Sequence, residues 1–340
     1  MRNVWKNFTH FTRPRMPFKQ PNCLTQEYAT RLIQNVDNFL FDCDGVIWNW
    51  PKPIEGAVAF INKLKELKKK CFFITNNSTK TREMVMDLLV KIGISNVVLD
   101  DIVCTSWILA QYLKSIDFKD KVYVIGSGAI ATELEKESIK HIGIGPNHEQ
   151  IPDPGKFDYA SLIKLDPEVK CVVVAFDHYF NYPKMVIGTS YARRKDCLFI
   201  ATNDDAQFPT GTSHVIIPGT GSFVNAMKTS VGKNPIILGK PHRTMWEVLE
   251  KVHKLDSNRS IIIGDRLDTD IALAANCSLG YSLAVLSGVT DEEMIQDYAK
   301  SLESEKLSND EAKCVPDFYA ENLGTFEKFI REHIQFMAEI

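Results

Sequence analysis

Short apolar runs alternate with amphipathic segments along most of this chain. The first run, Phe39–Phe41, is followed by a segment at 55–69 in which Val58, Ile61 and Leu64 recur at helical spacing. The runs are continuous rather than alternating with polar residues, which is typical of strands covered on both faces. We therefore predict an α/β fold with a doubly wound parallel sheet. Further strands are predicted at 71–75, 122–125, 171–176, 198–202, 236–238, 260–263 and 281–286, and helices at 81–91, 129–137, 183–193, 242–253 and 268–275.

The length of the chain predicts more than one domain. It has 340 residues, and single hydrophobic cores rarely grow that large. About 160 residues separate Thr75 from Lys240, too many for a loop inside a compact domain, and they contain strand and helix patterns of their own. We predict an N-terminal extension at 1–35, a core domain at 36–117 and 235–340, and an inserted α/β domain at 118–234.

Composition and charge exclude several classes of protein. Hydrophobic residues make up 44% and charged residues 24% of the chain, as in ordinary globular proteins. A net charge of −3 gives no broad basic field for nucleic acid, and no apolar run approaches the roughly 20 residues of a membrane-spanning helix. The eight cysteines form no C-x-x-C pair, which argues against a zinc ribbon or a thioredoxin-type site and predicts reduced thiols.

The first 26 residues contain five lysines and arginines and no acid before Glu27. No apolar core segment is present, so this is not a secretory signal. Pro14, Pro17 and Pro21 interrupt any long helix, and serine is absent. We predict a disordered or loosely docked extension on a cytoplasmic protein. The alternative is a mitochondrial transit segment.

Two carboxylates follow the first predicted strand, in the sequence Asp42-Cys43-Asp44-Gly45. Burying charge is expensive unless a metal or another cation compensates it, so the pair is either a solvated turn or a site. The glycine falls at the fourth position and no glutamate closes the loop, which excludes an EF-hand.

Polar residues also follow three other predicted strands. Thr75-Asn76-Asn77-Ser78 follows the strand at 71–75, Gly239-Lys240-Pro241 follows the strand at 236–238, and Gly264-Asp265 opens a run of acids after the strand at 260–263. Each segment alone is an ordinary turn or helix cap. In a doubly wound sheet, however, ligands bind outside the carboxyl ends of the strands. Four such ends together indicate one site.

The residue types at these strand ends suit phosphoryl transfer. Asp42 and Asp265 offer the hard oxygen ligands that Mg²⁺ prefers. Hydroxyl, amide and backbone donors at Thr75 and Asn76, with the point charge of Lys240, suit a phosphate group. A carboxylate in line with phosphorus can form an aspartyl-phosphate, and Asp44 can protonate the leaving oxygen and later deprotonate water.

These four motifs resemble those of the haloacid dehalogenase superfamily of phosphatases. The matching segments are D-C-D-G-V at 42–46, T-N-N-S at 75–78, G-K-P at 239–241 and G-D-R-L-D-T-D at 264–270. The chain is most similar to the 4-nitrophenylphosphatase-like branch, which contains phosphoglycolate and pyridoxal phosphate phosphatases. The resemblance extends from about Val36 to the C-terminus.

The resemblance implies a role for each motif residue. Asp42 is expected to be the nucleophile and a metal ligand, and Asp44 the general acid and base, with its backbone carbonyl as a further ligand. Mg²⁺ is the expected cofactor. The resemblance implies phosphate binding by Thr75, Asn76, Asn77 and Lys240, metal binding by Asp265, and a supporting position for Asp270 behind the metal. It also implies that the inserted domain is a cap over the site and that the enzyme is a homodimer through that cap.

A second candidate function comes from the sequence Gly126-Ser127-Gly128-Ala129-Ile130-Ala131, which fits the dinucleotide fingerprint G-x-G-x-x-A. The acid expected after the next strand is missing, so we interpret the segment as a tight strand-to-helix turn rather than as the site of a nicotinamide-dependent oxidoreductase. A phosphomutase would share these motifs. Release of free phosphate, rather than formation of an isomerised ester, distinguishes a phosphatase from a phosphomutase. A non-catalytic interaction protein is disfavoured by the intact acidic and lysine set.

The predicted substrate rests on the segment 201–209, which resembles the specificity loop of the branch and contains Asp205 and Phe208. The resemblance implies a histidine at the position of Phe208 in pyridoxal phosphate phosphatases. Phe208 offers no hydrogen bond to a pyridine ring. We therefore predict a small aliphatic phosphate monoester, 2-phosphoglycolate or glycerol 3-phosphate, with pyridoxal 5′-phosphate as the alternative. Phe208 could also serve only to pack the cap.

Overall fold

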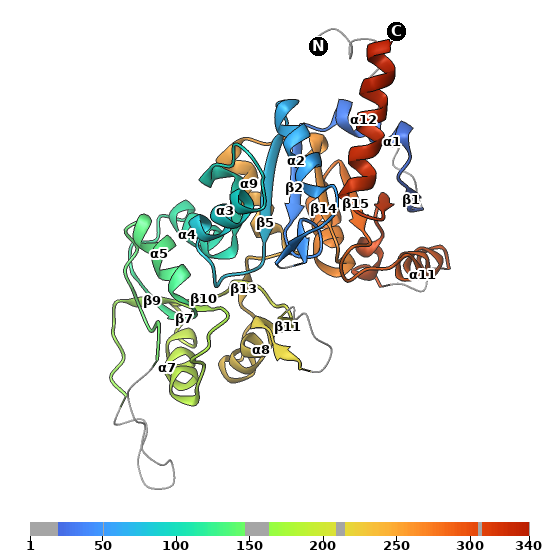
Figure 1. Ribbon diagram of the computed structural model, residues 1–340. Coiled ribbons are helices and arrows are strands. Elements are labelled where there is room, and N and C mark those ends of the chain that lie inside the picture. Colours follow the sequence, from blue (N-terminus) through green and yellow to red (C-terminus); the bar gives the residue numbers. More distant parts are fainter. Residues whose placement is uncertain (1–19, 50, 147–162, 209–214, 305–307, 340) are drawn as a thin grey trace. The chain divides into compact units, whose positions relative to one another are not determined.

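The computed structural model describes residues 20–49, 51–146, 163–208, 215–304 and 308–339, which form two compact units (Figure 1). The chain leaves the first unit after Thr75 and enters the second at Asn76. The first unit also holds Val85–Val103 and the chain from Leu249 onward, and the second holds Asn76–Met84 and Cys104–Val248. The domain limits inferred from the sequence, at 36–117, 118–234 and 235–340, remain a prediction.

The first unit is built on a seven-stranded parallel sheet. Two strands that lead to predicted metal ligands, β2 (Asn38–Asp42) and β14 (Ser260–Gly264), are neighbours at its centre, with Phe41 level with Ile263. Their carboxyl ends therefore meet at one edge of the sheet. The strand order is β1 (Asn22–Cys23), β16 (Phe318–Ala320), β15 (Tyr281–Val285), β14, β2, β5 (Lys70–Thr75) and β6 (Ile102–Cys104).

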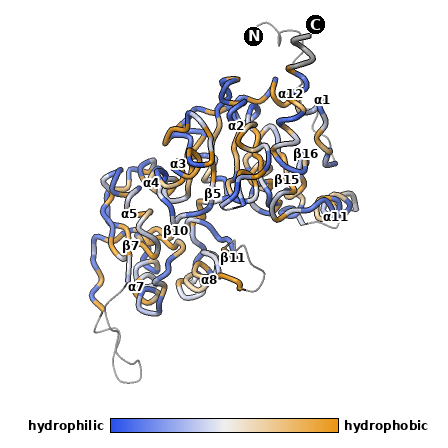
Figure 2. Tube along the Cα trace, in the orientation of Figure 1, coloured by the Kyte–Doolittle hydropathy of each residue, from blue (hydrophilic) through white to orange (hydrophobic). Residues whose placement is uncertain are grey.

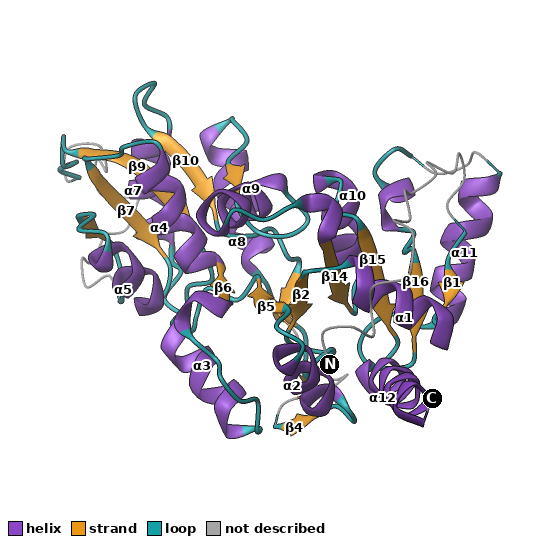
Figure 3. Ribbon diagram, turned by 90° about the horizontal axis from the view of Figure 1, so that it is seen from above, coloured by secondary structure: helices purple, strands orange, loops and turns teal. Residues whose placement is uncertain are grey.

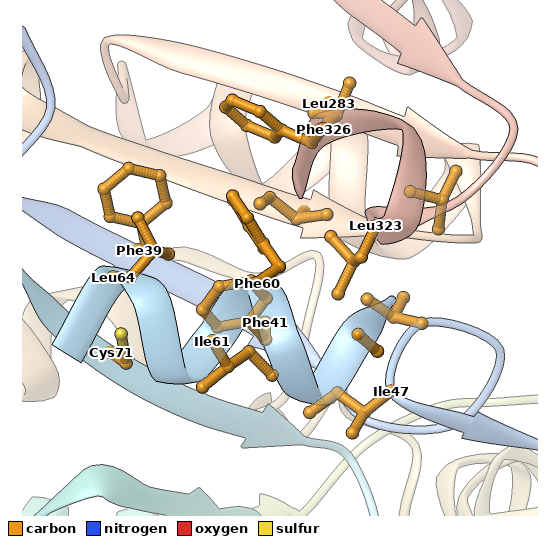
Figure 4. Close-up of a cluster of buried hydrophobic side chains, with 14 of the residues drawn as sticks. Phe39, Phe41, Ile47, Phe60, Ile61, Leu64, Cys71, Leu283, Leu323 and Phe326 are labelled. Atoms are coloured by element: carbon orange, nitrogen blue, oxygen red, sulfur yellow. The ribbon is translucent and has the colours of Figure 1, made fainter. Parts of the chain in front are cut away.

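One face of this sheet is covered by α2 (Ala57–Glu66) and α12 (Leu323–Glu339) (Figure 4). Phe60 of α2 has its ring centre 6.1 Å from that of Phe41 and 4.5 Å from that of Phe326 in α12. All three side chains are fully buried. Burying a phenylalanine contributes about 1.5–3 kcal/mol, so this cluster fixes β2 against its helices.

The opposite face packs against the segment after β14. Leu267, Ile271 and Ala272 form a buried cluster with Ala284 of β15 and Ile295 of α11 (Glu292–Glu303). A π-helical turn at Leu267–Ile271 leads directly into α10 (Ala272–Cys277). Seen from above in Figure 3, helices flank both faces of the sheet. The predicted doubly wound α/β fold is confirmed.

The second unit contains a separate five-stranded parallel sheet. Its core includes Tyr123, Val172, Phe199 and Met227, all buried. The strand order is β13 (Ile236–Ile237), β10 (Leu198–Ala201), β9 (Val169–Val174), β7 (Lys121–Ile125) and β8 (His141–Ile142), and the accompanying helices are α4 (Thr105–Ser115), α5 (Gly128–Lys136), α7 (Tyr182–Ala192) and α8 (Thr220–Val231).

The strand before Lys240 lies in a different sheet from the one we expected. We predicted that the strand at 236–238 joins the sheet that carries Asp42, because its end was grouped with the other motif-bearing strand ends. In the structure, β13 pairs with β10, with Ile200 level with Ile236, in the second unit. The strand is short and half-exposed, and its continuous apolar residues do not reveal which sheet it joins.

We predicted a disordered or loosely docked segment at the N-terminus, but its described part, from residue 20 onward, packs against the first unit. β1 pairs with β16, and α1 (Gln26–Asn35) begins at the N-cap Thr25. Leu24 is buried in the core of the first unit, and so are Ala29, Leu32 and Ile33, whose spacing places them on one face of α1. The part of the predicted extension before residue 20 lies outside the described residues.

All eight cysteines lie in the described residues, and none forms a disulfide. Seven are buried and only Cys23 is exposed. Burial raises the pKa of the Cys71 thiol to about 12, so it stays protonated at neutral pH. The seven buried thiols therefore act as small apolar core groups.

The hydropathy of the chain alternates along each unit, and the helices carry hydrophilic as well as hydrophobic segments (Figure 2). Within the part of the chain that the structure describes, no helix has both the length and the apolar character needed to cross a bilayer.

Candidate active site

The end of β2 delivers Asp42 and then turns sharply. Asp42 and Asp44 are half-buried, while Cys43 between them is buried in the core. Gly45 has a φ of +78°, which glycine adopts without strain. A Cβ atom on Gly45 would lie 2.3 Å from Oδ2 of Asp265. Only glycine at this position lets the turn and the second carboxylate approach one another.

Asp265 follows β14 and is 4% exposed. A third loop, after β15, closes over it. Oδ2 of Asp265 accepts the N–H of Val289 at 2.9 Å, and the backbone oxygen of Asp265 accepts the N–H of Thr290 at 3.0 Å. A Cβ atom on Gly288 would lie 2.0 Å from Oδ2 of Asp265. The loop thus fixes the carboxylate by backbone donors at close range.

This loop also contacts the turn after β2. The hydroxyl of Ser287 donates to the backbone oxygen of Gly45 at 2.7 Å. The side chain of Asn49 donates to the backbone oxygen of Ser287 at 3.1 Å. Sequence analysis did not identify residues 286–290 as part of the site. They hold the Asp42 turn and Asp265 together.

Asp270 lies on the π-helical turn after β14 and is 1% exposed. Its Oδ2 accepts the N–H of Arg266 at 3.2 Å. Asp42, Asp265 and Asp270 each place a carboxylate oxygen within 4.8 Å of the others. We expected Asp270 to stand behind the metal ligands, and the structure brings its carboxylate into the same cluster.

The donor set of this cluster fits a divalent cation of the Mg²⁺ type. Three carboxylates at such separations repel one another, and two of the three are almost fully buried. A cation among them removes that repulsion, and Mg²⁺ prefers hard oxygen ligands. Asp42, Asp265 and Asp270 are therefore the candidate metal ligands among the described residues, in addition to the predicted backbone carbonyl of Asp44.

The carboxylate of Asp44 is held separately from this cluster. The indole Nε1 of Trp48 donates to Oδ1 of Asp44 at 2.9 Å. Trp48 opens the short strand β3 (Trp48–Asn49), which pairs with β4 (Lys52–Pro53), and it is 4% exposed. A buried tryptophan on a hairpin thus orients the predicted general acid.

The predicted phosphate-binding residues begin at the end of β5. Thr75 is its last residue and is buried. In the second unit, Asn76 and Lys240 contact one another, with Oδ1 of Asn76 accepting the N–H of Lys240 at 2.8 Å. The structure therefore brings two of the predicted residues together directly.

Asn77 shapes the turn that follows. Its Oδ1 accepts the N–H of Thr79 at 2.8 Å and the hydroxyl of Thr79 at 2.7 Å. Ser127 donates its hydroxyl to the backbone oxygen of Ser78 at 2.7 Å. Ser127 belongs to the segment that fits the dinucleotide fingerprint, and α5 begins at the next residue. These contacts favour the interpretation of that segment as a strand-to-helix turn.

The two predicted cap residues lie in one segment of the second unit. Asp205 accepts from the side-chain amide of Asn76 at 3.2 Å through each of its oxygens. Phe208 belongs to β11 (Gln207–Phe208), which pairs with β12 (Ile217–Pro218). The ring of Phe208 lies 5.1 Å from the ring of Phe176, centre to centre. Phe208 therefore packs within its own unit.

Comparison with known proteins identifies the family. A model described as haloacid dehalogenase-like hydrolase matches residues 39–140, and a second, HAD-hydrolase-like model matches residues 237–324. Glycerol-3-phosphate phosphatase of Homo sapiens is 35% identical over 88% of this chain and 93% of its own length. The chain belongs to the haloacid dehalogenase-like hydrolases. Within this family it falls in the branch of 4-nitrophenylphosphatases, phosphoglycolate phosphatases and glycerol-3-phosphate phosphatases.

Two further relatives support this branch of the haloacid dehalogenase-like hydrolases. Chloroplastic phosphoglycolate phosphatase 1A of Arabidopsis thaliana is 39% identical over 88% of this chain and 79% of its own length. The solved structure of p-nitrophenyl phosphatase from Archaeoglobus fulgidus is similar with a TM-score of 0.69 and 25% identity, over 86% of this chain and 99% of that one. The predicted fold and family are confirmed.

The contact between Gly288 and Asp265 gives a testable prediction. In the Gly288→Ala variant the added methyl group displaces the Asp265 carboxylate, and we expect the free energy of unfolding to fall by about 1–3 kcal/mol. The rise in melting temperature on adding MgCl₂ should shrink or vanish, because that rise reports the affinity for the ion.

The matched control is Gly128→Ala, since a Cβ atom there meets nothing within 4 Å. It should keep the Mg²⁺-dependent rise of the wild type. An undiminished rise in Gly288→Ala would show that the loop does not fix the cation site.

Proposed function

We propose that this phosphatase hydrolyses small aliphatic phosphate monoesters with Mg²⁺ as cofactor, and that glycerol 3-phosphate and 2-phosphoglycolate are its substrates. The observation that carries the proposal is the convergence of Asp42, Asp265 and Asp270 at the carboxyl ends of β2 and β14. The phosphatase class itself follows from the family and from relatives that share most of the chain.

The proposed mechanism begins with Asp42. Its carboxylate attacks phosphorus, the bond between phosphorus and the alcohol oxygen breaks, and Asp44 gives its proton to that oxygen. Asp44 then takes a proton from water as the water attacks the aspartyl-phosphate, which releases phosphate and restores Asp42. The two steps balance: one water is consumed for one ester bond.

The remaining residues bind and orient. Asp42, Asp265 and Asp270 would hold the cation, which supplies positive charge beside the phosphoryl oxygens. Thr75 and backbone N–H groups of the loop it opens donate to those oxygens, and Lys240 adds a positive charge. Trp48 keeps the Asp44 carboxylate oriented through its indole N–H.

The substrate proposal rests on the segment that carries Phe208. Its apolar ring is half-buried against Phe176 and offers no hydrogen bond to a pyridine substituent. The names of two relatives, glycerol-3-phosphate phosphatase and phosphoglycolate phosphatase, point to small aliphatic esters. Residues 118–234 are the proposed cap that covers the leaving group.

The same cap is proposed to form a homodimer. Val215 and Ile216 are 61% and 68% exposed, and Ile217 beside them is 39% exposed. Burial against the same apolar residues of a second copy would remove them from water. Light scattering should show a dimer for the wild type and a monomer for Ile216→Asp, whereas a monomeric wild type would contradict the proposal.

The role of Asp44 predicts a dependence on the leaving group. In Asp44→Asn, kcat/KM for glycerol 3-phosphate should fall by about 10²–10⁴-fold, because an alkoxide leaves poorly without a proton. The value for 4-nitrophenyl phosphate should fall far less, since nitrophenolate needs no proton to leave. Equal losses on both esters would remove the acid role, and Asp42→Asn should be inactive on both.

The substrate proposal predicts an order of kcat/KM on one enzyme preparation. Glycerol 3-phosphate or 2-phosphoglycolate should exceed pyridoxal 5′-phosphate by at least about tenfold, which corresponds to roughly 1.4 kcal/mol of transition-state discrimination. The measurement is phosphate release at several concentrations of each ester.

Each of these assays is repeated with excess chelator and then with added MgCl₂. Loss and recovery of phosphate release assign the activity to the cation-dependent site. A preference for pyridoxal 5′-phosphate would overturn the substrate proposal alone, whereas full activity in chelator would overturn the metal role.

A further inference from the structure

The side chain of Asn76 is the centre of a buried hydrogen-bond network in the second unit. Its Oδ1 accepts the N–H of Lys240 at 2.8 Å, and its Nδ2 donates to the backbone oxygen of Lys240 at 3.0 Å. Nδ2 also faces both carboxylate oxygens of Asp205 at 3.2 Å. Asn76 is 9% exposed and Lys240 is 3% exposed.

This network uses the donor capacity of the Asn76 side chain completely. A primary amide carries two N–H donors. One is directed at the oxygen of Lys240, and the other is shared between the two oxygens of Asp205. The N–H of Lys240 must point at an acceptor, which fixes the amide orientation. A phosphoryl oxygen needs donors, so this side chain cannot serve it without breaking one of these bonds.

The backbone of Asn76 is fixed as firmly as its side chain. Its carbonyl oxygen accepts the hydroxyl of Thr105 at 2.9 Å and the side-chain amide of Asn203 at 2.8 Å. Lys240 is held at both its N–H and its carbonyl oxygen by a single amide, as a neighbouring strand would hold it. The T-N-N-S segment thereby fixes the backbone position from which the Lys240 side chain extends.

Asp205 is fixed from the other side. Its N–H donates to Oδ1 of Asn203 at 3.2 Å. Its carbonyl oxygen accepts the N–H of Gly221 at 2.8 Å, and Gly219 donates to the next residue, Ala206, at 2.8 Å. The Gly219-Thr220-Gly221 segment therefore anchors the loop that presents Asp205.

We propose that Asn76 and Asp205 are positioning residues that act through Lys240, and that neither side chain contacts the substrate. The proposal rests on the proposed function, because it assigns Lys240 to the phosphoryl group. It gives the Asn76 amide and Asp205 roles other than the phosphate binding and leaving-group selection that the resemblance implies. Truncation of either residue should then change kcat more than the affinity for phosphate.

The test is a rescue experiment. Asn76→Asp replaces the donor Nδ2 by an oxygen beside the Asp205 carboxylate, and we expect kcat on 4-nitrophenyl phosphate to fall by at least about 100-fold, as for other displaced catalytic groups. Adding Asp205→Asn returns a donor opposite the new oxygen and should recover at least about tenfold of kcat. If Asn76 instead donated to the phosphoryl group, the second substitution would recover nothing, and the inhibition constant of inorganic phosphate would rise in parallel with the loss.

Asp204→Asn is the matched control for the second substitution. Asp204 pairs with the half-exposed His242 at 3.3 Å and makes no side-chain contact with Asn76 among the described residues. It should leave the wild type active and should not rescue Asn76→Asp. Rescue by both substitutions would show a general charge effect and overturn the proposal.

Asp205→Ala covers the case in which Asn76→Asp does not fold. It leaves the bonds between Asn76 and Lys240 in place, and we expect kcat to fall about 3–10-fold, the effect of one weakened hydrogen bond. The inhibition constant of inorganic phosphate should stay within about twofold. Loss of selectivity among leaving groups at unchanged kcat would instead assign Asp205 to the substrate. If the wild type released no phosphate from any ester in the presence of Mg²⁺, the proposed function itself would be contradicted. That result differs from all of the outcomes above, which compare variants with an active wild type.

Discussion

The repulsion among three carboxylates is the constraint on which the rest of this structure depends. Asp42, Asp265 and Asp270 stand within 4.8 Å of one another at a sheet edge, and two of them are almost fully buried. Buried like charges are strongly unfavourable without a compensating cation. The first unit holds them there at the expense of its own stability, through the paired strands β2 and β14 and the aromatic core below them. Such stored repulsion is typical of functional sites.

Backbone groups and small residues position the charged side chains of the candidate site, and the charged side chains are the groups proposed to bind the ligands. Asp265 is fixed between Gly45 and Gly288, each of which leaves no room for a side chain, and by the N–H of Val289. In the second unit a similar division exists: the Asn76 amide holds Lys240 by its backbone N–H and carbonyl oxygen and not by its ammonium group. In both units, then, neutral hydrogen-bonding neighbours orient residues that carry charge.

The sequence predicted those parts of the fold and site that have a local signature. Strands β2, β5 and β14 were predicted because they are continuous apolar runs, and Asp42, Asp44 and Asp265 because carboxylates follow such runs. The 286–290 loop was missed, since its contribution is made by backbone N–H groups and a missing Cβ atom, which depend on tertiary contacts. The docking of residues 22–26 was missed because basic and proline-rich composition was weighted above their short apolar positions, and the strand pairing of Asn22 and Cys23 depends on a partner far along the chain. The sheet of β13 was misassigned, because two apolar residues cannot specify a neighbour.

A crystal structure of the protein grown with Mg²⁺ and beryllium trifluoride tests the central claim most directly, since beryllium trifluoride mimics a phosphoryl group bound to a carboxylate. The account predicts one ion with oxygens of Asp42 and Asp265 at about 2.0–2.1 Å, the usual Mg²⁺ distance, and beryllium bonded to Asp42. It also predicts that Asn76 still binds Lys240 and Asp205 rather than the fluorides. An ion bound elsewhere, with neither Asp42 nor Asp265 as a ligand, would contradict the account.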